Sequence, residues 1–278
     1  MQRSDGNYDS SRSVFPVDHS FAWAETVYWV AAGALVVLFA VTLGLHIFDK
    51  RMILDESMWT KPLKFHLALA VHFATLALAT STLSQSYRAS PLLLTFAIAA
   101  VASAAFELVY MTVQAARLQT SHFNLSTPFY ATMYAFMAAG AVIITAAAGA
   151  VGLAVWLDKA SSVAPVLRTA VALGLIGGTA LTLIVAFRMG AALSHHVGIE
   201  GTNAARVPFF GWSRTVGDLR VPHFLATHMM QALPIAGLAI ERVASGSIAL
   251  VLIWSFAAFW SLLTMYAFNR ALAGEPLL

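Results

Sequence analysis

Residues 131–157 read ATMYAFMAAGAVIITAAAGAVGLAVWL and contain no charged side chain. A helix of about 20 mostly apolar residues is long enough to cross the hydrocarbon core of a bilayer, and this run exceeds that length. Residues 243–269 form a second long run without a charge. Two such runs in one chain predict a polytopic helical membrane protein.

The composition of the whole chain agrees with this reading. Of its 278 residues, 59% are hydrophobic and only 10% are charged, whereas soluble domains carry about 25% charged residues. We therefore predict an all-α fold, a bundle of seven transmembrane helices in a single domain at residues 22–273, after a polar tail at residues 1–21. The spans are expected near residues 22–48, 61–84, 92–117, 129–156, 165–192, 222–242 and 246–270.

The distribution of basic residues predicts an orientation. Seven spans place the termini on opposite sides of the membrane, with six lysines and arginines on the N-terminal side and ten on the other. Because basic residues are enriched in cytoplasmic connections, we expect the N-terminus outside and the C-terminus in the cytoplasm.

Residue counts exclude several classes of site. The chain has no cysteine, which excludes disulfides and thiolate metal sites and leaves histidine as the strong nitrogen ligand. The net charge of +3 is spread over helix ends, so we interpret it as a membrane feature and expect no nucleic-acid partner.

Polar side chains are concentrated on the predicted cytoplasmic side. They occur at the end of the first span, the start of the second, the end of the third, in the next connection and at the start of the sixth, in the stretches WTKPLKFH (59–66), SHFNLSTP (121–128) and GDLRVPHFLATHMMQALP (217–234). A polar rim at the headgroups would decorate both sides equally. This asymmetry predicts a site between spans two, three and six, and the long connection at 193–221 is expected to fold over it.

Glu107 is the candidate catalytic or proton-carrying residue. It lies about 15 Å from the end of its span by the helix rise, where a carboxylate is costly unless it is neutral or partnered. The alternative role for Glu107 is a hydrogen-bonded clasp between helices.

His72 and His228 lie at matching depths on two spans, so they are the candidate metal or cofactor ligands. Their alternative role is hydrogen bonding between helices. The shallower His66 and His223 point to other faces of the same helices, because offsets of six and five residues change the helix face. His66 and His223 are nevertheless further candidate cofactor-binding residues, together with Arg220, Lys64 and Gln231.

Two features of the spans carry predictions about packing. Gly174 and Gly178 form a pair of small residues expected at a close helix contact. Pro234 frees the carbonyl of Met230 from its helical bond, so the sixth span is expected to be buried in protein or beside a cavity there.

The three polar stretches resemble signatures of a family of bacterial polytopic membrane proteins without an assigned activity. This resemblance implies a multi-pass protein of the bacterial inner membrane and transfers no catalytic residue. The chain does not resemble microbial rhodopsins, because the seventh span has no lysine for retinal, or seven-span zinc hydrolases, because that span has no histidine.

Four functions compete at this stage. The first is electron transfer or sensing by haem b held by His72 and His228, with Arg220 and Lys64 near the propionates and a quinone as a possible partner. The second is a metal-dependent membrane enzyme, an oxidoreductase or hydrolase. The third is a proton-coupled transporter or a receptor for a small or lipidic ligand. The fourth is a structural role.

Overall fold

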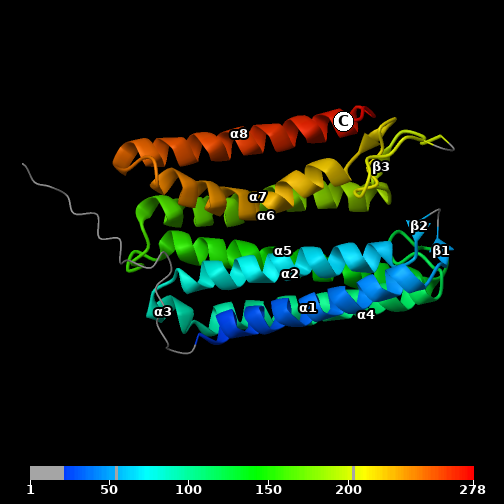
Figure 1. Cartoon of the computed structure of the whole chain (residues 1–278), viewed down its shortest axis with the longest axis horizontal. Coiled ribbons are helices and arrows are strands. Elements are labelled where there is room, and N and C mark those ends of the chain that lie inside the picture. The colour runs from blue at the N-terminus through cyan, green and yellow to red at the C-terminus, as the bar shows by residue number, and fades with distance from the viewer. Residues whose placement is uncertain (1–21, 54–55, 202–203) are drawn as a thin grey trace, which may run out of the picture.

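Helices account for most of the chain in the computed structural model, which describes residues 22–53, 56–201 and 204–278 (Figure 1). Within these residues, seven helices are long and apolar enough to cross a membrane, which confirms the predicted all-α bundle of a multi-pass membrane protein. The predicted tail lies outside the described residues. The seven helices are α1 (Trp23–Phe48), α2 (Thr60–Ser81), α4 (Pro91–Ala116), α5 (Pro128–Leu157), α6 (Pro165–Ala192), α7 (Arg220–Glu241) and α8 (Gly246–Leu272).

The remaining elements are short and lie in the connections. Strands β1 (Met52–Ile53) and β2 (Glu56–Ser57) pair antiparallel between α1 and α2. Strands β3 (His196–Val197) and β4 (Gly217–Asp218) pair antiparallel between α6 and α7. The single-turn helix α3 (Gln85–Arg88) joins α2 to α4. These elements position polar side chains at the two ends of the bundle.

Proline marks the start of three long helices. Pro91, Pro128 and Pro165 stand at the first positions of α4, α5 and α6, where the missing N–H costs nothing. The hydroxyl of Thr127 also caps α5 by accepting from the Tyr130 N–H. In α2, by contrast, Trp59 holds the cap position and no side chain makes the cap bond.

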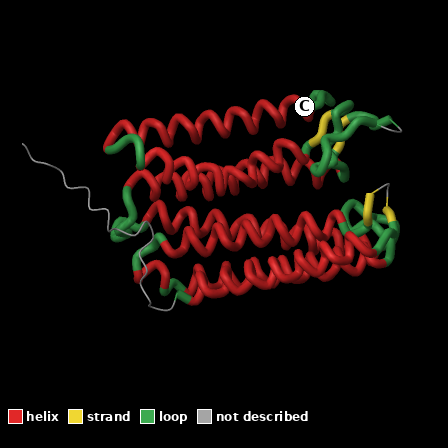
Figure 2. The backbone as a smooth tube through the Cα atoms, viewed as in Figure 1, coloured by secondary structure: helices red, strands yellow, loops and turns green. Residues whose placement is uncertain are grey.

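The seven helices form two groups along the chain (Figures 1 and 2). Helices α1, α2, α4 and α5 pack on one another and form the first group, while α6, α7 and α8 form the second. The groups meet mainly where α5 packs on α6. At this seam an added Cβ at Gly152 would lie 2.7 Å from the Cβ of Leu175, so the two backbones approach closely.

Glycines also bring α6 against α7. An added Cβ at Gly178 would lie 2.7 Å from the Cγ of Met230, and one at Gly174 would lie 3.2 Å from the Cδ of Pro234. The predicted close helix contact at this glycine pair is confirmed. Pro234 lies inside α7 and lines a cavity of about 170 Å³ between α2, α6 and α7. Of the two expected environments, the structure places this proline beside a cavity.

Candidate functional site at the polar end of the bundle

The predicted polar segments meet at one end of the bundle. We call it the polar end: α2, α5 and α7 begin there, and α1, α4, α6 and α8 end there. The hairpins β1–β2 and β3–β4 lie at this end (Figure 1). At the opposite end, the buried Arg88 pairs with Glu25 at 2.8 Å, and the buried Asp158 accepts the Ser84 N–H at 2.6 Å. The charges of these two clusters are therefore committed to structural bonds.

Glu107 is buried in α4 and lies against α5. Its side chain is only 4% exposed, and its Oε1 has no hydrogen-bond partner among the described residues. The Cβ that Gly140 lacks would lie 2.9 Å from this oxygen, so the glycine makes room for the carboxyl group. Lys61 interacts with it electrostatically. Among the described residues, Glu107 is thus a buried acid that makes no hydrogen bond to a neighbouring helix.

His72, in α2, is a second buried group, and it faces the same side of α5 as Glu107 does. Its ring interacts with the backbone of Ile144 in α5, one helical turn beyond Gly140. The Nε2 atom is buried and has no hydrogen-bond partner among the described residues. Glu107 and His72 therefore face α5 from two different helices at successive levels.

Lys61 lies at the entrance to this pair. Its Nζ lies 3.0 Å from Nδ1 of His122, which also lies 3.1 Å from the Ser121 hydroxyl. Burial and the positive charge of Lys61 lower the pKa of His122 to about 3, so at neutral pH this ring is uncharged and its Nδ1 accepts from the ammonium. Sequence reasoning assigned His122 only to a tight connection.

Lys61, Glu107 and His72 form what we call the polar row. Lys61 is the second residue of α2, and His72 follows eleven positions later, about 16 Å deeper by the helix rise. Glu107 lies nine positions before the end of α4, at about 14 Å. The row therefore extends from the polar end to the middle of the bundle.

His66 faces a different neighbour from His72. Its Nδ1 lies 3.1 Å from the Thr42 hydroxyl of α1, and both residues are buried. As expected from their spacing, the two histidines of α2 contact different helices. His66 joins α1 to α2 and is separated from the polar row.

His228 belongs to a hydrogen-bonded bridge between the two helix groups. Its Nδ1 lies 3.1 Å from Oε1 of Gln231, and the Gln231 amide donates to the Thr75 hydroxyl of α2 at 3.0 Å. The ring also packs on Phe224 with centroids 4.1 Å apart. His228 and Gln231, three residues apart in α7, therefore act together in this bridge. His223 has a buried Nδ1 with no partner among the described residues.

The connection between α6 and α7 folds over the polar end, and we call its described residues, 193–201 and 204–219, the cap. Asp218 fixes it: its carboxylate accepts from the Ser213 N–H at 2.9 Å and from the Arg220 Nε at 2.9 Å. Nε2 of His196 lies 3.6 Å from the same carboxylate. Asp218 and Arg220 thus form an ion pair.

Shifted pKa values fix the charge states of two cap residues at neutral pH. Burial raises the pKa of the Asp218 carboxyl, but hydrogen bonds from His196 and Arg220 outweigh it and hold that pKa well below its usual range. Burial, followed by the charge of Arg220, lowers the pKa of His195 to about 4. Both cap histidines, His195 and His196, are half-buried.

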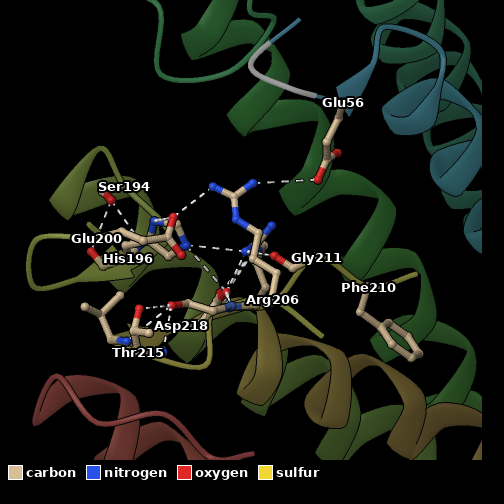
Figure 3. Close-up of polar contacts among 12 residues, drawn as sticks. Glu56, Ser194, His196, Glu200, Arg206, Phe210, Gly211, Thr215 and Asp218 are labelled. Atoms are coloured by element: carbon tan, nitrogen blue, oxygen red, sulfur yellow. Dashed lines mark hydrogen bonds and ion pairs between the residues drawn. The ribbon is translucent and has the colours of Figure 1, made fainter. Parts of the chain in front are cut away.

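The two candidate anion ligands, Arg220 and Lys64, differ in the number of their protein partners. Arg220 bonds Asp218 and donates to the Gly211 carbonyl at 2.7 Å, while Lys64 donates to the Phe210 carbonyl at 3.3 Å. Arg206 was not anticipated; it lies between Glu200, at 2.9 Å, and Glu56, at 3.9 Å (Figure 3). Together these contacts tie the cap to α2, α7 and the β1–β2 hairpin.

The described residues contain no group of three or more histidines and carboxylates placed to hold a metal ion. His72 contacts α5, whereas His228 contacts Phe224 and Gln231. Joint ligation of a metal or haem by these two residues stays a prediction.

Comparison with protein-family models, curated proteins and solved structures finds no match for this chain. The bacterial origin implied by the resemblance of three stretches therefore also stays a prediction.

Proposed function

We propose that this protein is a proton-coupled membrane transporter for a small solute, with Glu107 as the proton carrier. The observation that carries the proposal is the buried, unpartnered carboxyl group of Glu107 in the polar row. An ionisable residue in a membrane span is expensive and marks proton relays and ion pathways. Glu107 meets that description, because no described residue hydrogen-bonds its Oε1 and Gly140 provides the space beside it.

The neighbours of Glu107 support proton movement. Lys61, near the polar end, interacts electrostatically with Glu107, and the deeper His72 offers a ring nitrogen, Nε2, without a hydrogen-bond partner among the described residues. A neutral imidazole both donates and accepts protons. The three groups therefore provide an entry, a carrier and a deeper acceptor along one path.

The division of the bundle supports transport rather than a static site. Transporters commonly move one group of helices against another around a central site. Here the two groups share one extensive contact, α5 on α6, plus the Gln231–Thr75 bridge and the cap contacts. The polar row lies in the first group, where Glu107 and His72 lie against α5, the helix that makes that contact.

The haem hypothesis is less well supported. A haem with two axial histidines needs both imidazole rings to face the same space between helices. His72 and His228 instead contact different neighbours. The cavity between α2 and α7 has a volume of about 170 Å³ and is lined by neither histidine. An optical spectrum of the purified protein tests haem directly, and a Soret band would favour it over transport.

Charge movement after a pH jump tests the transport proposal. Purified protein in liposomes is adsorbed to a solid-supported membrane, and the transient current after a rapid pH change reports proton binding inside the protein. Glu107→Gln should lose most of the displaced charge. Glu241→Gln, which removes a half-buried carboxyl at the other end of α7, is the matched control and should retain it. Wild-type charge in Glu107→Gln would refute the assigned carrier.

The finer localisation is part of the same proposal. With the predicted orientation, the polar end and the cap face the cytoplasm of a bacterial cell and the N-terminus is outside. Labelling of single cysteines, introduced into a chain that has none, measures this orientation without background.

A further inference from the structure

A cavity lies at the polar end, between the cap and the β1–β2 hairpin. It has a volume of about 680 Å³, within the range of about 300–1,000 Å³ that small-molecule sites occupy. Its walls come from both helix groups: β1–β2 and the start of α2 on one side, and the cap on the other. We call it the cap pocket.

Opposite charges meet at one point of the cap pocket. Gly211 has a φ of +73° and lies between the two charged side chains. A Cβ added at this glycine would lie 3.0 Å from Oε1 of Glu56 and 4.0 Å from Nζ of Lys64. These two charged atoms are therefore at most about 7 Å apart. They do not form a direct ion pair, because among the described residues no carboxylate lies within 4.0 Å of the Lys64 ammonium.

A third charged residue completes the polar wall. Nη1 of Arg206 lies 3.9 Å from Oε1 of Glu56, and both side chains are over 40% exposed. Two cationic side chains and one carboxylate thus line the pocket, with solvent access. A ligand that satisfies all three carries an anionic group for Lys64 and Arg206 and an ammonium group for Glu56.

The spacing selects a compact zwitterion. Charge-assisted hydrogen bonds of about 2.8 Å at each end, together with the roughly 3 Å between the ammonium and carboxylate of an α-amino acid, span somewhat more than 8 Å. This reach covers the gap of at most about 7 Å between Glu56 and Lys64.

The rim of the pocket adds an apolar preference. Phe209 is 73% exposed and Met52 is 55% exposed, and both line the cavity. Phe209 also has a φ of +66°, a backbone conformation that is unfavourable for a bulky residue. The turn is fixed by the Gly211 N–H donating to the Val207 carbonyl at 2.8 Å.

From these observations we infer that the cap pocket binds a free α-amino acid with an apolar side chain. The carboxylate lies at Lys64 and Arg206, the ammonium at Glu56, and the side chain against Phe209 and Met52. Binding is a property of the cap pocket alone. That the bound amino acid is the transported solute rests on the proposed function.

Calorimetric titration of the full-length protein tests the site. The protein is held in phosphatidylcholine nanodiscs, and the probes are leucine, methionine and phenylalanine. N-acetyl-leucine, which lacks the ammonium, and leucinamide, which lacks the carboxylate, should each bind at least about tenfold more weakly than leucine, because each loses a charge-assisted hydrogen bond. Absence of binding by all three amino acids, or equal binding of N-acetyl-leucine and leucine, would overturn the proposal.

Variants separate the pocket from general effects of charge. Lys64→Gln and Glu56→Gln should each weaken leucine binding at least about tenfold. The matched control is Arg214→Gln, which removes an exposed cap arginine that does not line the pocket, and should bind as the wild type does. Unchanged binding in both pocket variants would assign the site elsewhere and overturn the proposal.

Two further arms distinguish the ligand source and the proposed function. A phosphatidylethanolamine headgroup also carries an ammonium and an anionic group. Loss of leucine binding in nanodiscs of that lipid would therefore assign the pocket to the headgroup and overturn the proposal that it binds a free amino acid. The pH-jump charge is measured without leucine, and leucine binding at constant pH. If leucine does not bind but the pH jump still moves charge, only the amino-acid site is refuted. If leucine binds but the pH jump moves no charge, only the role of Glu107 as proton carrier is refuted.

Discussion

Gly217 in the cap should tolerate no side chain. An added Cβ there would lie 2.0 Å from the carbonyl oxygen of Ala271 and 2.9 Å from its carbon, near the end of α8. Real Cβ contacts shorter than 3.0 Å essentially do not occur, so Gly217→Ala requires a movement of at least about 1 Å. The colliding atoms are backbone atoms and cannot rotate away as a flexible side chain can.

The expected cost follows from this geometry. Overpacking of a fixed contact destabilises by about 1–3 kcal/mol, and we expect the upper half of that range. In a chain of this size, about 2–4 °C of melting temperature is lost per kcal/mol, which predicts a decrease of roughly 5–10 °C for Gly217→Ala.

Thermal unfolding in detergent, followed by tryptophan fluorescence, measures this decrease, and Trp212 places a reporter in the cap itself. The control is Gly33→Ala, because an added Cβ at Gly33 in α1 meets no atom within 4 Å. Replacing a helical glycine with alanine should stabilise by about 0.5–1 kcal/mol. If the melting temperatures of the Gly217→Ala and Gly33→Ala variants agree within error, the described docking of the cap on α8 is wrong.

The other predictions concern pH and the polar bridges. His122 and His195 are held neutral, with pKa values of about 3 and about 4, whereas histidine in an unfolded chain has a pKa near 6.5. Below about pH 6.5 the unfolded chain therefore binds more protons than the folded chain. The free energy of unfolding should fall by up to about 1.4 kcal/mol per pH unit for each residue between about pH 6.5 and 4. Melting temperatures across this range check the slope, and His122→Asn should flatten it. Asp218→Asn should cost about 2 kcal/mol at pH 7. Because the folded chain lowers the pKa of Asp218 from an unfolded value of about 4, this cost should be complete above about pH 4 and should decrease progressively below it; an equal loss at pH 2 and pH 7 would contradict the assigned ion pair. Gln231→Leu removes the bond to Thr75 and should cost about 1 kcal/mol, with Thr75→Val as the partner variant; additive losses in the double variant would show that the bridge is not formed.

Helix positions were predictable because hydropathy determines them directly. The predicted spans agree with the helices to within three residues at every boundary. Depth along a helix was predictable for the same reason, and Glu107 lies nine positions before the end of α4, close to the ten positions expected. The polar asymmetry of the sequence likewise indicated the end at which the cap folds.

Neighbours across helices were not predictable. In lipid both the packed and the exposed faces of a helix are apolar, so hydropathy does not fix the rotation of a helix towards its partners. Matching depth alone suggested joint ligation by His72 and His228, which stays a prediction; the neighbours of the two rings, α5 for His72 and Phe224 for His228, come from the structure. Gly140, which provides the space beside Glu107, gave no signal of its own in the sequence.

The order of the two helix groups along the chain has a consequence for biosynthesis. Because α1 to α5 leave the ribosome before α6, the first group can insert and pack around Glu107 while the second is still being made. The only covalent link between the groups is the short segment at 158–164. Two fragments divided within this segment should therefore reassemble when they are co-expressed, much as separately synthesised halves of a polytopic protein associate after insertion, through the glycine seam between α5 and α6.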